Sequence, residues 1–196
     1  METIILASNS GQRQEYFKLL GLPFKVIPSG MDEIIGNVTD GKKAAETLAV
    51  QKAKKVNDLL NDEEKTWVAG ADTLIYLDGK IYGKPENREH AREMLYCLRG
   101  RTHEVITAVA LINSKKNVFD CCSASGKVTF SSMDDKEIEW YLDTNEWEGA
   151  AGSYKIQGLA SCFISRICGS YSSIVGLPLY EFYVMLRHNG YLYGYS

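Results

Sequence analysis

The fold is decided by one stretch of the chain, Trp67-Val68-Ala69-Gly70-Ala71-Asp72-Thr73-Leu74-Ile75-Tyr76. Its first five residues carry no charge and predict a buried strand, and an aspartate and a threonine then follow with no break in the run. Asp78-Gly79 comes next between two apolar runs, which is a strong signal for a β-hairpin. The return arm ends at Gly83-Lys84-Pro85, where the proline favours an extended Lys84. The sequence therefore predicts a buried strand that contains an acid, with a lysine returning beside it.

A buried Asp72 requires a partner, because taking a carboxylate out of water is costly unless a lysine or a metal ion compensates it. In a hairpin with a two-residue turn, Lys84 lies opposite Thr73, so Asp72 and Lys84 would point to opposite faces of the sheet. We therefore predict a bulge, or an early end of the ladder, that brings the two charges together. A plain ion pair at the mouth of the sheet is the alternative interpretation.

Composition places the chain among ordinary globular proteins. It has 196 residues, 45% hydrophobic and 24% charged, with a net charge of −3, which suits one domain over residues 1–196. Acids and bases alternate without a basic stripe, so no nucleic acid polymer is expected as a partner. The five cysteines are odd in number and form no CxxC pair, and the three histidines show no ligand spacing, so we expect no zinc site and a reduced compartment. We see no signal peptide and no membrane span, and expect a cytoplasmic protein.

Apolar periodicity predicts strands that alternate with helices, an α/β pattern. Strands are expected at residues 4–7, 24–27, 67–77, 80–82, 102–113, 118–130 and 159–167. Helices are expected at residues 11–20, 42–60, 87–98, 134–142 and 179–186, the first with Ser10 as its N-cap. We expect Leu19 on the inner side of the first helix, and Leu59 in the inward stripe of the second.

Two cations stand at informative places in these helices. Arg13 lies in the first turn after a strand, and a helix N-terminus in that position favours an anion. An ordinary capped helix with a surface arginine is the alternative. Lys52 falls within the apolar stripe of the second helix, four residues from Leu48 and four from Val56. Its ammonium either extends along the surface to reach water or is directed into a cleft.

Other polar residues become candidates for a functional site only if the fold brings further functional groups near them. Asp32 and Glu33 are adjacent acids in a loop, which are usually solvated. Gln157 is polar among apolar neighbours and precedes Gly158, which allows close approach of the backbone. It either satisfies backbone groups of its loop or contacts a ligand.

These pieces, in this order, resemble the Maf family of nucleoside triphosphate pyrophosphatases. The matching segments are Leu6-Ala7-Ser8-Asn9-Ser10 with Arg13, Asp32-Glu33, Lys52-Ala53, Ala71-Asp72-Thr73, Gly83-Lys84-Pro85, His103-Glu104-Val105, Ile156-Gln157-Gly158, Gly169-Ser170-Tyr171 and Val175-Gly176-Leu177-Pro178-Leu179. They cover the chain almost from end to end. Several motifs in register are far more specific than any one of them.

The resemblance implies a mixed twisted sheet flanked by helices, with a deep cleft between two lobes, like that of inosine triphosphatases. It implies hydrolysis between the α and β phosphates of a nucleoside triphosphate with a divalent metal, Mg²⁺ or alternatively Mn²⁺. Glu33 and Asp72 would hold the metal and water, and Asp72 would accept the proton. Three cations would face the phosphates: Arg13, Lys52 and Lys84. A homodimer is also implied, and a nucleotide-binding regulator of cell division with little hydrolysis remains the alternative.

Substrate binding is expected at five polar positions: Ser8, Ser10, Gln12, Thr73 and Gln157. In the family, the last three of these positions are associated with substrate choice. Thr73 and Gln157 look like the members that act on dTTP and UTP. Gln12 departs from the family, which usually has arginine there or, in 7-methyl-GTP-type members, tryptophan. A glutamine amide both donates and accepts, which is compatible with a pyrimidine edge. A family lysine is also replaced, by Ala150.

Overall fold

The computed structural model describes residues 1–31 and 40–191. Strands and helices follow one another as β1 (Ile4–Leu6), α1 (Gly11–Leu19), β2 (Phe24–Val26), α2 (Gly41–Leu59), β3 (Trp67–Leu77), β4 (Lys80–Tyr82), α3 (Arg88–Leu98), β5 (Thr102–Asn113), β6 (Val118–Phe130), α4 (Asp135–Asp143), β7 (Ile164–Gly169), α5 (Tyr171–Val175) and α6 (Leu179–His188). Three short 3₁₀ helices join them: η1 (Ser114–Lys116), η2 (Ala151–Ser153) and η3 (Leu159–Phe163). The mixed α/β class is confirmed.

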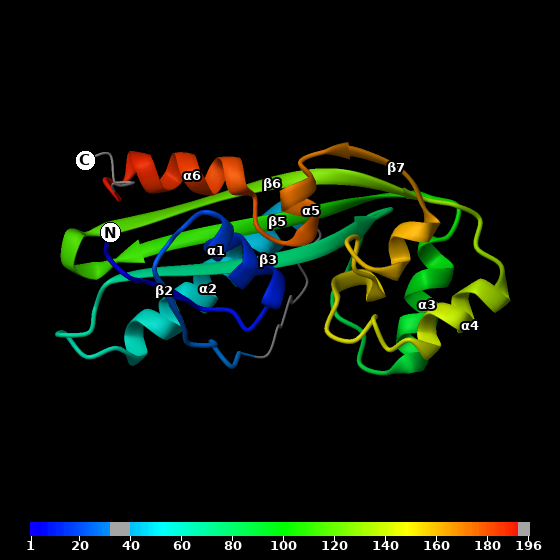
Figure 1. Cartoon of the computed structure of the whole chain (residues 1–196), viewed down its shortest axis with the longest axis horizontal. Helices are drawn as coiled ribbons and strands as arrows, with labels where there is room; N and C mark the ends of the chain where they lie inside the picture. The colour runs from blue at the N-terminus through cyan, green and yellow to red at the C-terminus, as the bar shows by residue number, and fades with distance from the viewer. Residues whose placement is uncertain (32–39, 192–196) are drawn as a thin grey trace.

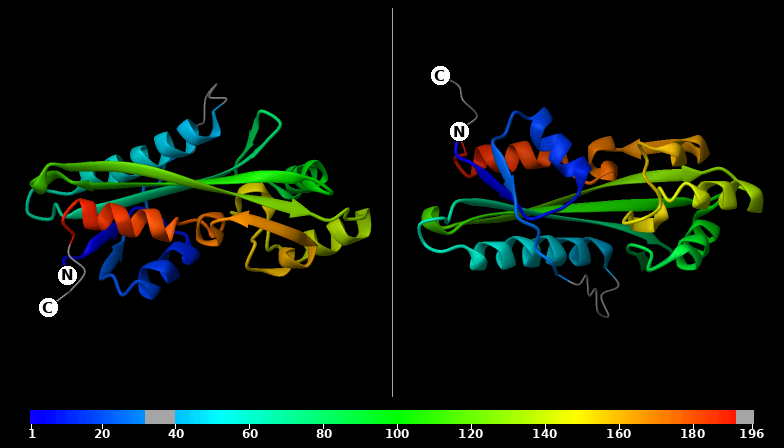
Figure 2. Two further views of the ribbon diagram at one scale, coloured as in Figure 1. Left: turned by 90° about the horizontal axis from the view of Figure 1, so that it is seen from above. Right: turned by 60° about the horizontal axis from the view of Figure 1, so that its bottom comes forward.

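Three long strands, β3, β5 and β6, run the length of the molecule and connect its two lobes (Figure 1). The seven-stranded sheet has the order β2-β1-β3-β5-β6-β7, with β4 also paired to β3. β1 is parallel to β2 and β3, while the other pairs are antiparallel. In the first lobe, α2 covers one face of the long strands and α1 and α6 cover the other (Figure 2). The second lobe contains α3, α4 and β7.

The strand β3 is paired differently along its two edges. β5 pairs with it continuously from Val68 to Tyr76. On the other edge, β1 pairs with Trp67–Ala69 and β4 with Ile75–Leu77, so among the described strands none pairs with residues 70–74 there. On this edge, β1 therefore pairs with the first part of β3 and β4 with its last part, and the interval between them is open, without a paired strand. Asp72 lies in this open interval.

Alternation along β3 distributes its side chains between separate cores. Trp67, Ala69 and Ala71 pack with α1 and α6, whereas Val68 and Leu74 pack against α2. Farther along, Ile75 and Leu77 belong to the core of the second lobe. The strand is therefore buried on both faces, as its uninterrupted apolar run predicts.

Gly70 brings α2 unusually close to β3. A Cβ atom built at this position would lie 2.4 Å from the carbonyl oxygen of Ala49 and 2.6 Å from the backbone nitrogen of Ala53. These are backbone atoms of α2, so only a residue without a side chain permits the contact. The close approach carries Lys52, which lies between those two residues, to the strand that bears Asp72.

The hairpin at Asp78-Gly79 is confirmed. Both turn residues have positive φ, 51° for Asp78 and 80° for Gly79, as a two-residue turn of the I′ type requires. The pairing of β3 with β4 begins at Leu77 with Lys80 and ends at Ile75 with Tyr82. The early end of the ladder that we predicted before Lys84 is therefore present.

Three details of the expected elements are wrong. Leu19 is 71% exposed and Leu59 is 66% exposed. In α1, Leu19 lies two residues from buried Phe17, and residues two apart point to opposite sides of a helix. At the end of α2, the C-cap residue Leu60 packs against the core in place of Leu59.

The third wrong detail is the strand expected over residues 159–167. It starts only at Ile164, because residues 159–163 form η3. The Glu146 carboxylate accepts hydrogen bonds from the backbone N–H groups of Leu159 and Ala160, at 3.0 and 3.3 Å, and so holds the start of this turn. Within residues 1–31 and 40–191, every helix is too short or too polar to span a lipid bilayer.

Candidate active site

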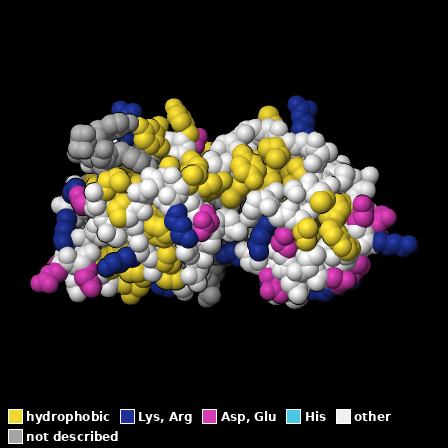
Figure 3. All heavy atoms as spheres, viewed as in Figure 1, with side chains coloured by type: hydrophobic (Ala, Val, Ile, Leu, Met, Phe, Trp, Pro, Cys, Tyr) yellow, Lys and Arg dark blue, Asp and Glu magenta, His cyan; other side chains and the backbone are white. Residues whose placement is uncertain are grey.

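A cavity of about 530 Å³ lies between the lobes, beside the open interval of β3. The molecule narrows at this place (Figure 3). Nine of the ten residues predicted for the site line the cavity: Ser8, Ser10, Gln12, Arg13, Lys52, Asp72, Thr73, Lys84 and Gln157. The tenth, Glu33, lies outside the described residues. The fold thus gathers side chains from the loop after β1, from α1, α2 and β3, from the chain after β4 and from the loop before η3 around one space.

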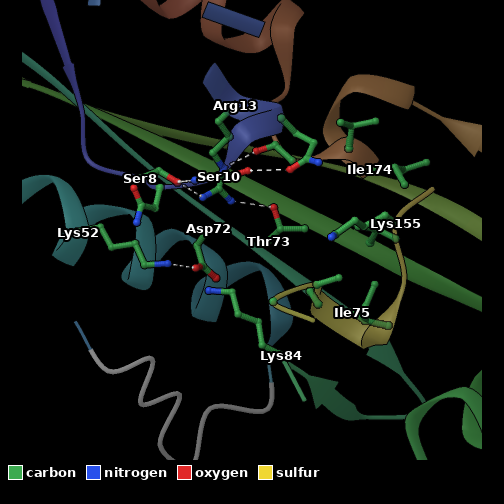
Figure 4. Close-up of a pocket in the computed structure, with 18 of the residues that line it drawn as sticks. Ser8, Ser10, Arg13, Lys52, Asp72, Thr73, Ile75, Lys84, Lys155 and Ile174 are labelled. Carbon is green, nitrogen blue, oxygen red and sulfur yellow. Dashed lines mark hydrogen bonds and ion pairs between the residues drawn. The ribbon is translucent and has the colours of Figure 1, made fainter. Parts of the chain in front are cut away.

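Asp72 and Lys52 form a buried ion pair in the cavity wall. The Nζ atom of Lys52 lies 2.5 Å from Oδ1 of Asp72, and the two residues are 7% and 2% exposed. Lys84 extends toward Asp72 from the other side (Figure 4). Lys52 is therefore directed into the cleft rather than along the surface. This partner comes from α2 and differs from the hairpin lysine that the plain ion pair at the sheet mouth would use.

Arg13 is a buried connector and not a surface arginine. Its guanidinium donates to the carbonyl oxygen of Gly176 at 2.8 Å, to Oγ of Ser8 at 2.9 Å and to Oγ1 of Thr73 at 3.1 Å. The residue is 8% exposed. These bonds tie the loop after β1, the strand β3 and the turn between α5 and α6 to one another, so Arg13 fixes the shape of the upper cavity wall (Figure 4).

Ser10 occupies the N-cap position of α1 as predicted, but its side chain does not cap the helix. Its hydroxyl instead donates to Oε1 of Gln12 at 3.3 Å, and its backbone N–H donates to Oγ of Ser8 at 3.3 Å. Ser8, Ser10 and Gln12 therefore form a small polar network at the start of α1. Ser10 and Gln12 also line the cavity, so the N-terminal end of α1 lies beside it, where an anion is favoured.

The opposite wall comes from the loop between α4 and η3. Ala150, Lys155, Ile156 and Gln157 all line the cavity from this loop. Lys155 was not among the predicted residues, although it stands directly before the matched segment Ile156-Gln157-Gly158. Three apolar side chains, Ile75, Val105 and Ile174, also line the cavity and were missed, because nothing distinguishes them from core residues in the sequence.

His103 and Tyr154 hold this loop to β5. The Nε2 atom of His103 lies 2.7 Å from the Tyr154 hydroxyl, and the His103 ring packs edge-on against Phe130 and Tyr154. His103 is 2% exposed. Burial lowers the pKa of His103 to about 4, so the ring is neutral at physiological pH. We assign it a structural part in placing the loop.

Metal binding at the site would depend on few protein ligands. In the described part of the chain, no three His, Cys, Asp or Glu side chains cluster as a metal cage. Mg²⁺, however, is usually held by one or two carboxylates together with water and substrate phosphates. A carboxylate in the wall of a cavity that also presents several cations fits that mode of binding.

The fold and the cavity define a class of protein: a mixed α/β domain whose inter-lobe cavity combines a buried carboxylate with cations and suits a phosphorylated ligand. The family model described as "Maf-like protein" matches residues 3–189. The chain belongs to the Maf family.

Among curated relatives, a dTTP/UTP pyrophosphatase of Fusobacterium nucleatum is 42% identical over 188 residues, 96% of each chain. A dTTP/UTP pyrophosphatase of Pelotomaculum thermopropionicum is 39% identical over 191 residues, 97% of this chain and 98% of the relative. One of Bacillus cereus is 41% identical over 179 residues, 91% of each chain. The solved Ham1 protein of Staphylococcus aureus is 12% identical, and the match covers 67% of this chain and 73% of the Ham1 chain with a TM-score of 0.44. This likeness is too weak to support an argument.

Proposed function

We propose that this chain is a nucleoside triphosphate pyrophosphatase that converts dTTP and UTP into the nucleoside monophosphate and pyrophosphate. The observation that carries the proposal is the buried Lys52–Asp72 pair in the cavity wall, with Lys84 extending toward it. The family and the names of its relatives support the same activity and the same two substrates.

In the proposed reaction, water attacks the α phosphorus and the bond from that phosphorus to the bridging oxygen of the β phosphate breaks. Pyrophosphate leaves, and the Asp72 carboxylate accepts a proton of the attacking water. Lys52 fixes the orientation of that carboxylate, because it bonds Oδ1. Lys52, Lys84 and Arg13 offset the negative charge that collects on the leaving pyrophosphate.

A divalent metal, Mg²⁺ or alternatively Mn²⁺, is part of the proposal. Bound by Asp72 and by Glu33, it would lower the pKa of a bound water and neutralise phosphate charge. The participation of Glu33 rests on the resemblance alone. The homodimer and the cytoplasmic location also stay predictions.

For the pyrimidine preference we propose Thr73, Gln157 and Gln12 as the residues that contact the base or lie beside it, with Ser8 and Ser10 near the phosphates. Thr73 is held in place by Arg13 and by a 2.9 Å hydrogen bond with Thr107. A fixed hydroxyl of this kind gives orientation at little entropic cost.

Pyrophosphate release by the purified protein across the eight common ribo- and deoxyribonucleoside triphosphates, with Mg²⁺ and with EDTA, tests the proposal. We expect the highest rates with dTTP and UTP and loss of activity in EDTA. Tight binding of nucleotides with no pyrophosphate release would favour the nucleotide-binding regulator of cell division instead.

A further inference from the structure

Lys155 is a charged residue of the cavity wall to which the proposed reaction assigns no role. It is half-buried and lines the cavity together with Gln157, two residues farther on. Figure 4 shows its ammonium pointing into the cavity, toward Thr73. Among the contacts of the described residues, none engages this ammonium. A lysine that points inward from a wall when water is available outside indicates a ligand group at its tip.

The surroundings of Lys155 differ from those of the other cations. Lys52, Asp72 and Lys84 lie on one side of Thr73, whereas Lys155 lies on the other side, with Ile75 and Ile174 (Figure 4). Val105 extends this apolar surface, since it pairs with Ile75 across β3 and β5 and also lines the cavity. An apolar surface can pack against the flat face of a base, whereas it offers no favourable contact to a charged triphosphate.

A tight turn places Lys155 and Gln157 in the same part of the cavity wall, because the backbone N–H of Gly158 donates to the carbonyl oxygen of Lys155 at 3.0 Å and both residues line the cavity. The segment enters from Tyr154 in extended conformation, with φ −148° and ψ 156°. Ile156, between the two polar residues, is 5% exposed and packs into the core of the second lobe. Ile156 thus anchors the turn in the core, and Lys155 and Gln157 flank it along the cavity wall.

Building on the proposed function, we infer that the Lys155 ammonium donates a hydrogen bond to the 4-carbonyl oxygen of the pyrimidine base and thereby selects uracil and thymine. Both bases carry acceptor oxygens on each side of an N–H donor. Lysine only donates, and the Gln157 amide both donates and accepts, so the two side chains together match that edge. Cytosine carries an amino group in place of the 4-carbonyl oxygen, so it offers the lysine no acceptor there.

Substitution of Lys155 by methionine keeps the length of the side chain and removes its charge. We expect Lys155→Met to weaken the binding of α,β-imido-dTTP about tenfold, the equivalent of one charge-assisted hydrogen bond. The dissociation constants of α,β-imido-dCTP and of inorganic pyrophosphate should stay unchanged. Lys136→Met, in the exposed part of α4, is the matched control and should leave all three constants unchanged.

Isothermal titration calorimetry with these three probes and Mg²⁺ separates the outcomes, with thermal unfolding of each variant as the check on folding. An equal loss for both nucleotide analogues, a weaker binding of pyrophosphate, or no loss for α,β-imido-dTTP would overturn the inference. Lys155→Arg, which keeps the charge, should retain the preference for the thymine analogue if the methionine variant proves unstable. The analogues are not hydrolysed, so this test measures binding alone. If the wild-type protein binds them but releases no pyrophosphate from dTTP or UTP, the proposed hydrolysis is refuted while the test of Lys155 stays valid.

Discussion

The Lys52 ammonium and the Asp72 carboxylate meet at 2.5 Å although they come from a helix and a strand twenty residues apart. Both side chains are almost fully buried, yet both line the inter-lobe cavity. A buried ion pair is weak evidence for stability, because the loss of hydration offsets much of the attraction. A functional explanation is better: Lys52 keeps the Asp72 carboxylate charged and oriented at the place where a ligand enters.

Removing the lysine of this pair should affect both activity and folding. Lys52→Met leaves a buried carboxylate with less compensation, and we expect the free energy of unfolding to fall by about 3 kcal/mol. Turnover of dTTP should fall at least about a hundredfold, because the orientation of Asp72 and a cation near the phosphates are both lost. Urea unfolding and pyrophosphate release measure the two effects. Lys54→Met, on the exposed side of α2, is the control, and equal behaviour of the two variants would contradict the assignment.

The contact between Gly70 and α2 gives a prediction about the fold. Gly70→Ala places a methyl group against backbone atoms of Ala49 and Ala53, which cannot move aside singly. We expect a loss of about 3 kcal/mol in the free energy of unfolding, as for other overpacked cores. Because α2 must shift, turnover should fall as well. Gly11→Ala, where the added methyl meets nothing within 4 Å, should be close to wild type in urea unfolding. A fully stable Gly70→Ala protein would mean that α2 does not lie as close as described.

His103 predicts a specific dependence of stability on pH. Its pKa in the folded protein is about 4, below the ordinary value of 6.5. The unfolded chain therefore takes up a proton between these two pH values while the folded protein does not, so stability falls as the pH is lowered through that window. Across the whole window, the free energy of unfolding falls by about 3 kcal/mol, from about 1.4 kcal/mol per pKa unit.

His103→Phe removes this titration while keeping a ring of similar shape. The difference in unfolding free energy between wild type and variant should shrink as the pH falls from 7.5 to 5, since only the wild type is penalised by protonation. Urea unfolding of both proteins at each pH gives the comparison. A difference that stays constant with pH would show that His103 is not held neutral by the fold.

Gln157 should act on substrate choice more than on rate. Gln157→Ala removes an amide from the cavity wall without touching the Lys52–Asp72 pair, so the ranking of nucleotides should change while activity persists. The ratio of kcat/KM values for dTTP, UTP, dCTP and dATP measures the effect. A uniform fall across these substrates, with the ranking preserved, would remove Gln157 from base recognition.

Much of the fold followed from local patterns in the sequence. The strands at residues 102–113 and 118–130 have the expected bounds, because long alternating or apolar runs specify a strand strongly. The Asp78-Gly79 turn fixed the register of β4 in advance, since a two-residue turn leaves only one pairing. The helix ends and the region at 159–163 were less predictable. There a distant carboxylate, that of Glu146, decides the local conformation.

The candidate site was predicted from single residues that break a pattern, such as an acid within an apolar strand and a lysine within an apolar stripe. That principle identified Asp72 and Lys52 but could not show that they touch, because the contact depends on how closely α2 packs at Gly70. Lys155 was missed for the opposite reason. It breaks no pattern in a loop, and only the placement of that loop across the cavity gives it significance.

Asp72→Asn tests the central claim most directly, because it removes one charge and keeps the size of the side chain. The measurement is pyrophosphate release from dTTP with Mg²⁺, alongside thermal unfolding. Asp78→Asn is the matched control, since Asp78 lies in the exposed hairpin turn at the end of the same strand and asparagine tolerates its positive φ. We predict that Asp72→Asn is folded and releases no pyrophosphate while Asp78→Asn is as active as wild type. Release at a near-wild-type rate by folded Asp72→Asn would contradict the account.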